Sequence, residues 1–568
     1  MGTPYLDPSA LDLLKEEIGS DETYVKVNSI HRLKTIATII GSEVIKQQLI
    51  PYLSTLMHED EEVLFALAKS LGDIYPFVQQ APASLLTLLE GLAGLDETVI
   101  REQAVKTLSE ISKTLSDSDM LNLFIPIVMK LAAAENFSSR VSACGLIAAA
   151  YPRAGAMREK LRNKFLELSH EDTPMVRRAA VIEMRKFSRV LEKAFLISDI
   201  IPDLRNLAQD EQDQIRTLCI DSLIEVAKLL SKEENRLHTL PLILVIGDDK
   251  SWKVRYNFAQ KFPVVAEALG RDITESSLIQ TFVQLLRDNE ADVKTTALDS
   301  LKSTLHFISR DRVQTLVFPT IEAIVSDNSL PPKVKKNCAT AIADLGASLG
   351  KDFASSKLMP IVMSLINDEN IDVKLNMVQG LGKLAVTIGN DMMTPGICSI
   401  LMTLSKDSPQ WRLRESVIRC CVAICKQLGD EIFTRSLQDI YFNFFLDPVS
   451  EVRNSGVQTL TEIISELGDE WVITELLPKL QDIYHQKNFI TRITVLHALS
   501  KLNLTVDQMS TMVYFAAKDN VPNVRLVLCK VMKEIGSRAD ISSLKNVLQE
   551  LAKDADKDVR YYALAALR

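Results

Sequence analysis

The sequence predicts an all-α fold, an α-α superhelix or solenoid of stacked helix hairpins, from three observations. An Asp-containing turn followed by an apolar-basic pair recurs, as at Val176-Arg177, Ile215-Arg216, Val254-Arg255 and Val293-Lys294. The pairs advance from 176 to 215, 254 and 293 in steps of 39 residues, a period typical of helical repeats. Apolar residues make up 47% of the 568-residue chain, whereas Gly and Pro number only 20 each, as expected for helices.

The apolar-basic pair continues toward both ends of the chain. It is clear at Val25-Lys26, Val334-Lys335, Val373-Lys374, Leu413-Arg414, Val452-Arg453, Val524-Arg525 and Val559-Arg560, and weaker at Val63-Leu64, Val99 with Arg101, Arg140-Val141 and Arg492-Ile493. Together these positions predict fifteen units, which leave no length for a separate catalytic domain.

Each period contains two runs with helical spacing of apolar residues. One unit has Leu278, Phe282 and Leu286 in its first run and Val293, Ala297 and Leu301 in its second, separated by the polar turn DNEAD. We expect segments such as SRDRVQ, residues 309–314, to link one hairpin to the next. A Pro stands 12 to 15 residues ahead of several pairs, which predicts a kink in the first helix, at Pro51, Pro126, Pro202, Pro241, Pro319 and Pro360. A kinked first helix, an Asp-containing turn and a Val-Arg opening to the second helix resemble HEAT repeats.

The turn Asp and the following basic residue favour a structural role. We expect each Asp, such as Asp210, to cap its second helix, while the basic side chain reaches the turn of the adjacent repeat. The alternative, a charged ridge for partners, is compatible with this role where a repeat carries an additional charge, as at Arg178.

Composition argues against several classes of function. A net charge of −9 disfavours nucleic acid and anionic membranes, and no apolar run is long enough to span a bilayer. Eight cysteines without a framework indicate reduced thiols, and Cys421 and Cys425, four residues apart, lack accompanying metal ligands. The Gly380-x-Gly382 pattern lies in an expected helix, so no dinucleotide site is predicted. We therefore expect no catalytic residue, no metal and no cofactor.

Tryptophan occupies the same position in two turns. Trp252 in SWKVR and Trp411 in QWRLR each stand two residues before the apolar member of the pair, where they either pack on the next turn or face a partner. Trp471 lies in a first-helix pattern and is expected in the core.

The turns HEDEEVLFALAKSLGD, DTPMVRRAA, DKSWKVRYNFAQKF, DSPQWRLRESVI and DNVPNVRL, in this order, closely resemble those of the scaffolding (A) subunits of protein phosphatase 2A. The resemblance spans nearly the whole chain and implies a horseshoe of about 15 HEAT repeats that performs no chemistry. After a short tail expected at residues 1–8, the resemblance implies repeats 1–10 at 9–400 on the side of an exchangeable regulatory B-type subunit. It implies repeats 11–15 at 401–568 on the side of the phosphatase catalytic subunit.

The resemblance also implies the contacting residues. On the regulatory side they are Glu62, Asp96, Glu97, Pro174, Arg177, Arg178 and Trp252. On the catalytic side they are Trp411, Arg412, Val449, Phe489, Val521 and Pro522. We accordingly expect a cytoplasmic and nuclear protein that is not a homo-oligomer. The alternatives are a HEAT-repeat nuclear-transport receptor, although the acidic insertion of that family is absent, and a scaffold of another complex.

Overall fold

The computed structural model describes residues 9–389, 396–485 and 488–567. The predicted tail at residues 1–8 lies outside this range. The described residues form helices, turns and loops, with no strand among them, which confirms the predicted fold class. The chain divides into two compact units, Met1–Leu285 and Leu286–Arg568.

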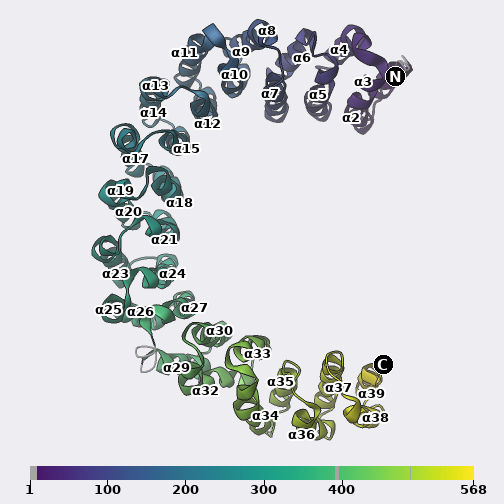
Figure 1. Cartoon of the computed structure of the whole chain (residues 1–568), viewed down its shortest axis with the longest axis vertical. Helices are drawn as coiled ribbons and strands as arrows, with labels where there is room; N and C mark the ends of the chain where they lie inside the picture. Colours follow the sequence, from purple (N-terminus) through teal and green to yellow (C-terminus); the bar gives the residue numbers. More distant parts are fainter. Residues whose placement is uncertain (1–8, 390–395, 486–487, 568) are drawn as a thin grey trace. The chain divides into compact units, whose positions relative to one another are not determined.

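The helices of the described residues fall, in chain order, into fifteen pairs, as the spacing of the apolar-basic pair predicts. In the N-terminal unit the second helices pack side by side in one layer (Figure 1). They are α2 (Thr23–His31), α5 (Glu61–Ile74), α7 (Thr98–Ser112), α10 (Phe137–Ala150), α12 (Pro174–Val190), α15 (Asp213–Leu229) and α18 (Trp252–Leu269). The first helices form the other layer: α1 (Ser9–Ile18), α3 (Leu33–Val44) with α4 (Ile50–Ser54), α6 (Ala83–Ala93), α8 (Asp117–Asp119) with α9 (Ile125–Ala132), α11 (Arg158–Ser169), α13 (Lys193–Phe195) with α14 (Ile201–Leu207), α16 (Lys232–Glu234) with α17 (Leu240–Gly247), and α19 (Arg271–Ile273) with α20 (Ile279–Leu286).

The C-terminal unit repeats the arrangement (Figure 1). Its second helices are α21 (Ala291–Thr304), α24 (Pro332–Leu349), α27 (Ile371–Ile388), α30 (Trp411–Leu428), α33 (Ser450–Trp471), α35 (Phe489–Leu499), α37 (Pro522–Gly536) and α39 (Lys557–Leu567). Its first helices are α22 (Arg310–Arg312) with α23 (Phe318–Ser326), α25 (Lys351–Phe353) with α26 (Met359–Ile366), α29 (Cys398–Asp407), α31 (Asp430–Ile432) with α32 (Gln438–Phe442), α34 (Leu477–Tyr484), α36 (Val506–Ala517) and α38 (Lys545–Leu551).

The predicted kink in the first helix is a π-helical turn that precedes the proline. Residues Asn235–Thr239 form one such turn between α16 and α17, and Pro241 is the second residue of α17. Pro lacks the N–H that an α-helix needs at this point, and the wider turn accommodates its ring. The turn also forms at Thr274–Leu278, where Ile279 and Gln280 follow, so proline is compatible with the kink but not required for it.

The residues predicted to link hairpins belong to helices. Ser309 is the N-cap of α22, and the rest of SRDRVQ continues through α22 into the π-helical turn Val313–Val317. The prediction of a linker is therefore wrong. The connection between repeats is shorter, and at Gly270 and Gly429 a single residue with φ of 81° and 88° makes it, a conformation that L side chains rarely adopt.

Candidate protein-binding surface

An Arg–Asp ladder joins the loops between the first and second helices of several neighbouring repeats. We use this name for the pairs Arg140–Glu171, Arg177–Asp210, Arg216–Asp249, Arg414–Asp447, Arg492–Asp519 and Arg525–Asp554. In each pair the guanidinium near the start of one second helix reaches the carboxylate in the turn of the next repeat. This confirms the predicted reach from repeat to repeat.

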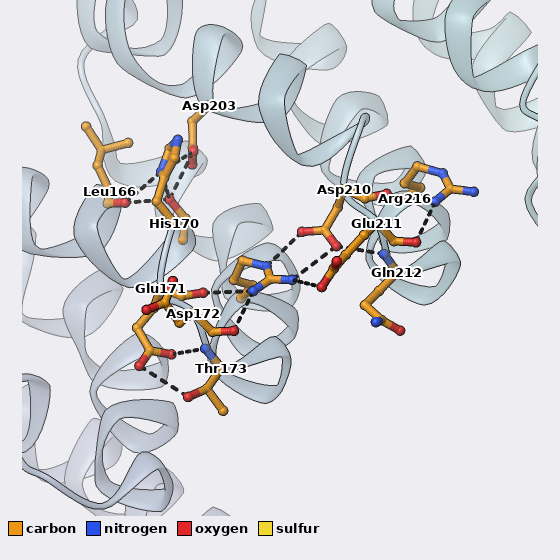
Figure 2. A network of polar contacts seen from close by, with 12 residues as sticks. Leu166, His170, Glu171, Asp172, Thr173, Asp203, Asp210, Glu211, Gln212 and Arg216 are labelled. Atoms are coloured by element: carbon orange, nitrogen blue, oxygen red, sulfur yellow. Dashed lines mark hydrogen bonds and ion pairs between the residues drawn. The ribbon is translucent and has the colours of Figure 1, made fainter.

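Arg177 illustrates the geometry. Its Nε and Nη2 donate to the two carboxylate oxygens of Asp210 at 2.7 and 3.2 Å, while Nη1 donates to the carbonyls of Glu171 and Asp172, each at 2.9 Å. Figure 2 shows Asp210 and these carbonyl-bearing residues. One guanidinium thus closes its own turn and binds the neighbouring turn in a bidentate manner, which fixes both distance and orientation.

The turn carboxylates do not cap the second helices, so that part of the prediction is wrong. The N-cap of α15 is Gln212, and its backbone N–H donates to Asp210 Oδ1 at 2.8 Å (Figure 2). Asp447 accepts in the same way from Val449, the N-cap of α33. The Asp closes a tight turn two residues ahead of the N-cap because its position is set by the guanidinium of the preceding repeat.

The pairing stabilises the charged forms. Hydrogen bonding to Asp210 raises the pKa of the Arg177 guanidinium, against the opposing effect of burial. The hydrogen bond from Arg525 lowers the pKa of Asp554 below its ordinary value. Arg453 differs, because its Nε donates to the Thr494 hydroxyl at 3.0 Å and burial lowers the pKa of its guanidinium. Most charges of the ladder are therefore paired with each other within the chain, where they join neighbouring repeats.

The residues expected on the regulatory side lie near the starts of second helices in the N-terminal unit. Glu62 is exposed in the first turn of α5, Glu97 is the N-cap of α7, Pro174 opens α12 and Trp252 opens α18. Asp96 accepts a hydrogen bond from Ser138 Oγ at 2.8 Å. Arg177 belongs to the ladder, whereas the neighbouring Arg178 is exposed and makes no hydrogen bond or ion pair within the described part of the chain.

The residues expected on the catalytic side share one structural position in the C-terminal unit. Trp411 and Arg412 are the first two residues of α30, Phe489 opens α35, and Val449 is the N-cap of α33. Val521 and Pro522 are the N-cap and first residue of α37. Because α30, α33, α35 and α37 pack successively, these side chains form a row across four consecutive repeats.

The three tryptophans differ in their surroundings. Trp252 is 39% exposed and meets Tyr256 edge-on, with ring centroids 6.5 Å apart. Trp411 is half-buried, and the Arg412 guanidinium lies 4.8 Å from the centre of its ring. Trp471 is buried against Phe442, as predicted. The two turn tryptophans therefore keep surface that a partner can cover.

The cysteines and the Gly380-x-Gly382 pattern lie in packed parts of the fold. All eight cysteines are buried, and the described residues contain no group of three potential metal ligands. Gly380 and Gly382 lie inside α27, where a Cβ would meet Ala343 and Ala423 of the neighbouring helices at 2.7 and 2.5 Å. These glycines let helices approach closely. In the part of the chain described, every helix is too short or too polar to cross a bilayer.

Comparison with known proteins adds sequence relationships to this geometry. Residues 351–440 match a family profile described as the PIK3R4-like middle domain. The chain is 36% identical over 263 residues to the A-type regulatory subunit of protein phosphatase PP2A from Schizosaccharomyces pombe, a match that covers 45% of each chain. It is 33% identical over 376 residues to the beta isoform of the human phosphatase 2A 65 kDa A-type regulatory subunit, covering 65% of this chain and 62% of that protein. The alignments thus span about half to three-fifths of these relatives.

Solved structures show the same fold at low sequence identity. A complex of Kap95 with Nup1 superposes with a TM-score of 0.58 at 14% identity, covering 98% of this chain and 75% of the other. Kap95p with RanGDP gives 0.56 at 12%, covering 98% and 80%. This likeness concerns the fold alone.

The paired helices, the kinked first helices and the ladder define an α-solenoid of HEAT-type repeats. The Kap95 structures share only 12–14% sequence identity with this chain, whereas the phosphatase 2A A-type subunits share 33–36%. The chain is a homologue of the A-type regulatory, or scaffold, subunits of protein phosphatase 2A, which are named as regulatory rather than catalytic components.

Sequence reasoning did not single out one buried cation near this surface. Arg101, at the start of α7, holds the ladder position but lacks a carboxylate partner among the described residues. The signal is visible in the sequence, because Ala134 stands where the three following repeats have Glu171, Asp210 and Asp249.

Proposed function

We propose that this chain is a non-catalytic scaffold subunit of a serine/threonine phosphatase of the 2A type. It holds the phosphatase catalytic subunit on repeats 11–15 and an exchangeable B-type regulatory subunit on the N-terminal repeats. We place this complex in the cytoplasm and nucleus, with one copy of the chain per complex. The observation that carries the proposal is the row formed by Trp411, Val449, Phe489 and Pro522 at equivalent helix starts in successive repeats.

A row of this kind suits a protein interface. Aromatic and Arg side chains contribute most to hot spots, and the Trp411–Arg412 pair combines both at one end of the row. Val449, Phe489 and Pro522 extend it with apolar groups that are partly or fully exposed. Holding two partners on one chain raises their effective concentration for each other, so the scaffold promotes assembly without performing chemistry.

The catalytic side is tested by Trp411→Ala and Trp252→Ala, which truncate tryptophans at the same repeat position in the two units. Removing a hot-spot side chain costs at least about 2 kcal/mol, or roughly thirtyfold in affinity. We expect Trp411→Ala to weaken binding of purified phosphatase catalytic subunit by that factor and Trp252→Ala to leave it unchanged, as measured by titration calorimetry. Equal affinity of the two variants would contradict the assignment.

The regulatory side is tested by a different pair. Arg178→Ala removes an exposed cation, while Arg177→Ala breaks the ladder. We expect Arg178→Ala to reduce capture of a purified B-type subunit with no change in melting temperature or in binding of the catalytic subunit. Loss of both partners together, or a lowered melting temperature in Arg178→Ala, would show that Arg178 is structural.

A further inference from the structure

A groove of about 1020 Å³ runs along α10 in the N-terminal unit, with α7 and α12 as its sides. Of the residues assigned above to the regulatory subunit, Arg178 alone lines it, so the groove is largely separate from the helix starts. Its floor is the half-buried face of α10. The lining residues of α7 run from Thr98 to Ser112, over the full 15 residues of that helix, so the groove is about 21 Å long at 1.5 Å per residue.

The floor is lined by small, apolar residues. Val141, Gly145 and Ala149 recur at a spacing of four residues and therefore lie on one face of α10. The position that follows the ladder Arg is Val141 in α10, Glu102 in α7 and Arg178 in α12. This position, charged in both neighbouring helices, is thus apolar in α10, and the short side chains of Val141, Gly145 and Ala149 lower the floor between the two flanking helices.

The groove contains a buried guanidinium without a counter-charge. Arg101 is 5% exposed and lines the groove. Its Nη1 donates to the carbonyls of Leu95 and Asp96 at 3.1 and 2.9 Å, and Nη2 donates to Thr98 Oγ1 at 3.3 Å. Its Nε has no hydrogen-bond partner, and no carboxylate pairs with this side chain anywhere in residues 9–389, 396–485 or 488–567.

Arg101 has no carboxylate partner because the ladder is interrupted at the next repeat. Arg177, Arg216 and Arg414 each pair with an Asp that lies 33 residues further along the chain. Counting 33 residues from Arg101 leads to Ala134, which has the same place in its turn as Asp210 has in its own. A buried charge without a partner is costly, which makes an external carboxylate favourable at this point.

The sides of the groove carry further free cations. Lys106 of α7, Lys113 at its C-cap and Arg178 of α12 are exposed, and within the described residues none of them makes an ion pair or hydrogen bond. The lining contains six basic residues and two acidic ones, Glu102 and Glu183, of which Glu183 is paired with Lys186 at 2.8 Å. The groove is therefore positive locally, although the whole chain has a net charge of −9.

We propose that this groove binds a helical segment of a protein partner that has small apolar residues on one face and carboxylates beside them. A helix lies over α10 at the usual 8–10 Å between packed helix axes because the floor side chains are short. One of its carboxylates takes the position that Ala134 leaves empty and pairs with Arg101. The other carboxylates meet Lys106, Lys113 and Arg178. The inference does not depend on whether the chain binds phosphatase subunits.

Two synthetic helical peptides of about 14 residues provide the probe. They share a Leu/Ala face and differ in carrying Glu or Lys at the other positions, with a hydrocarbon staple to keep both helical. Fluorescence anisotropy with the full chain measures binding. We expect the Glu peptide to bind, with an affinity that falls as salt is raised, and the Lys peptide to bind at least tenfold more weakly. Equal binding of the two, or no binding of the Glu peptide, would overturn the proposal.

Three variants locate the site. Ala134→Asp supplies the missing ladder carboxylate internally, and Ala149→Trp fills the floor. The control is Val264→Trp, at the position of α18 that corresponds to Ala149 of α10. We expect each of the first two to weaken the Glu peptide at least tenfold and the control to change it less than twofold. Because Ala134→Asp completes the ladder, its melting temperature should not fall, which separates loss of the site from loss of the fold. Unchanged binding in both groove variants would also overturn the proposal.

Discussion

Asp447→Ala is the substitution that tests most directly how the ladder stabilises the stack. The Arg414 and Asp447 side chains are only 8% and 4% exposed. The carboxylate accepts from Arg414 Nε at 2.6 Å, from Nη2 at 2.9 Å and from the Val449 backbone N–H at 2.8 Å. Truncating Asp447 leaves three donors without this acceptor, at the point where α30 meets α33.

The expected cost follows from that burial. Removing one member of a buried ion pair typically destabilises a protein by about 3–5 kcal/mol, since the other charge stays buried and unpaired. The same helices are also joined at their surface by Lys426 and Glu462, 2.6 Å apart with side chains 42% and 47% exposed. Exposed pairs contribute about 0–1 kcal/mol. Glu462→Ala is therefore a matched control that removes an ion pair between the same two helices.

Native-state hydrogen exchange is the appropriate measurement because long repeat arrays need not unfold in one step. We expect the amides in the second turn of α33, which donate to carbonyls of the first turn, to lose roughly two to four powers of ten in protection in Asp447→Ala, at about 1.4 kcal/mol per power of ten. In Glu462→Ala the loss should be within a factor of about five. Similar losses in both variants would refute the claim that burial makes the ladder the stronger coupling.

Three further predictions concern other parts of the chain. Burial raises the pKa of Asp203 to about 6, above the ~3.9 of an exposed Asp, because the fold favours the neutral carboxyl. The stabilisation from this neutral form is full below about pH 4 and is lost as the pH rises through 6. Asp203→Asn should therefore raise the melting temperature at pH 7.5 but not at pH 4.5, and a lower value at pH 7.5 would contradict this. A Cβ at Gly456 would overlap the ring of Phe444, so Gly456→Ala should lower the free energy of unfolding, measured with denaturant, by at least about 1–3 kcal/mol. A Cβ at Gly91 would face a flexible Met side chain, so Gly91→Ala should lower it by less. Burial raises the pKa of Cys425 to about 11, and all eight thiols are buried, so Ellman's reagent should react only after unfolding; rapid reaction of the native chain would refute this.

The repeat frame was predictable because one pattern recurs along the chain. The apolar-basic pair marks the start of each second helix, so the number of pairs and the reach of Arg177 to the next turn both follow from sequence. Trp471 was expected in the core from its place in an apolar helical run, and it is buried there. Such features depend on local pattern and on the requirement that hairpins stack.

Other features depend on three-dimensional detail that periodicity does not contain. The π-helical turn before Pro241 forms also before Ile279, so the proline marks the kink without specifying its geometry. Asp210 was expected as a helix cap because Asp favours that role, but the guanidinium of Arg177 holds it two residues ahead of the N-cap. Ala134 could have been noticed as a gap, yet the burial of Arg101 is needed to show what the gap implies.

The same turns both stabilise the stack of repeats and present side chains to solvent, because neighbouring residues in a turn have different roles. Arg414 points into the stack and fixes the offset between two repeats, while Trp411, three residues earlier, keeps part of its surface free. The start of α12 in the other unit shows the same division of roles: Arg177 pairs with Asp210, while Arg178 is exposed. Since bidentate bonds set the spacing of successive turns, the side chains beside them are presented at a regular interval along each unit. A partner that matches this interval binds a surface already ordered by the fold, so it loses little conformational entropy on binding.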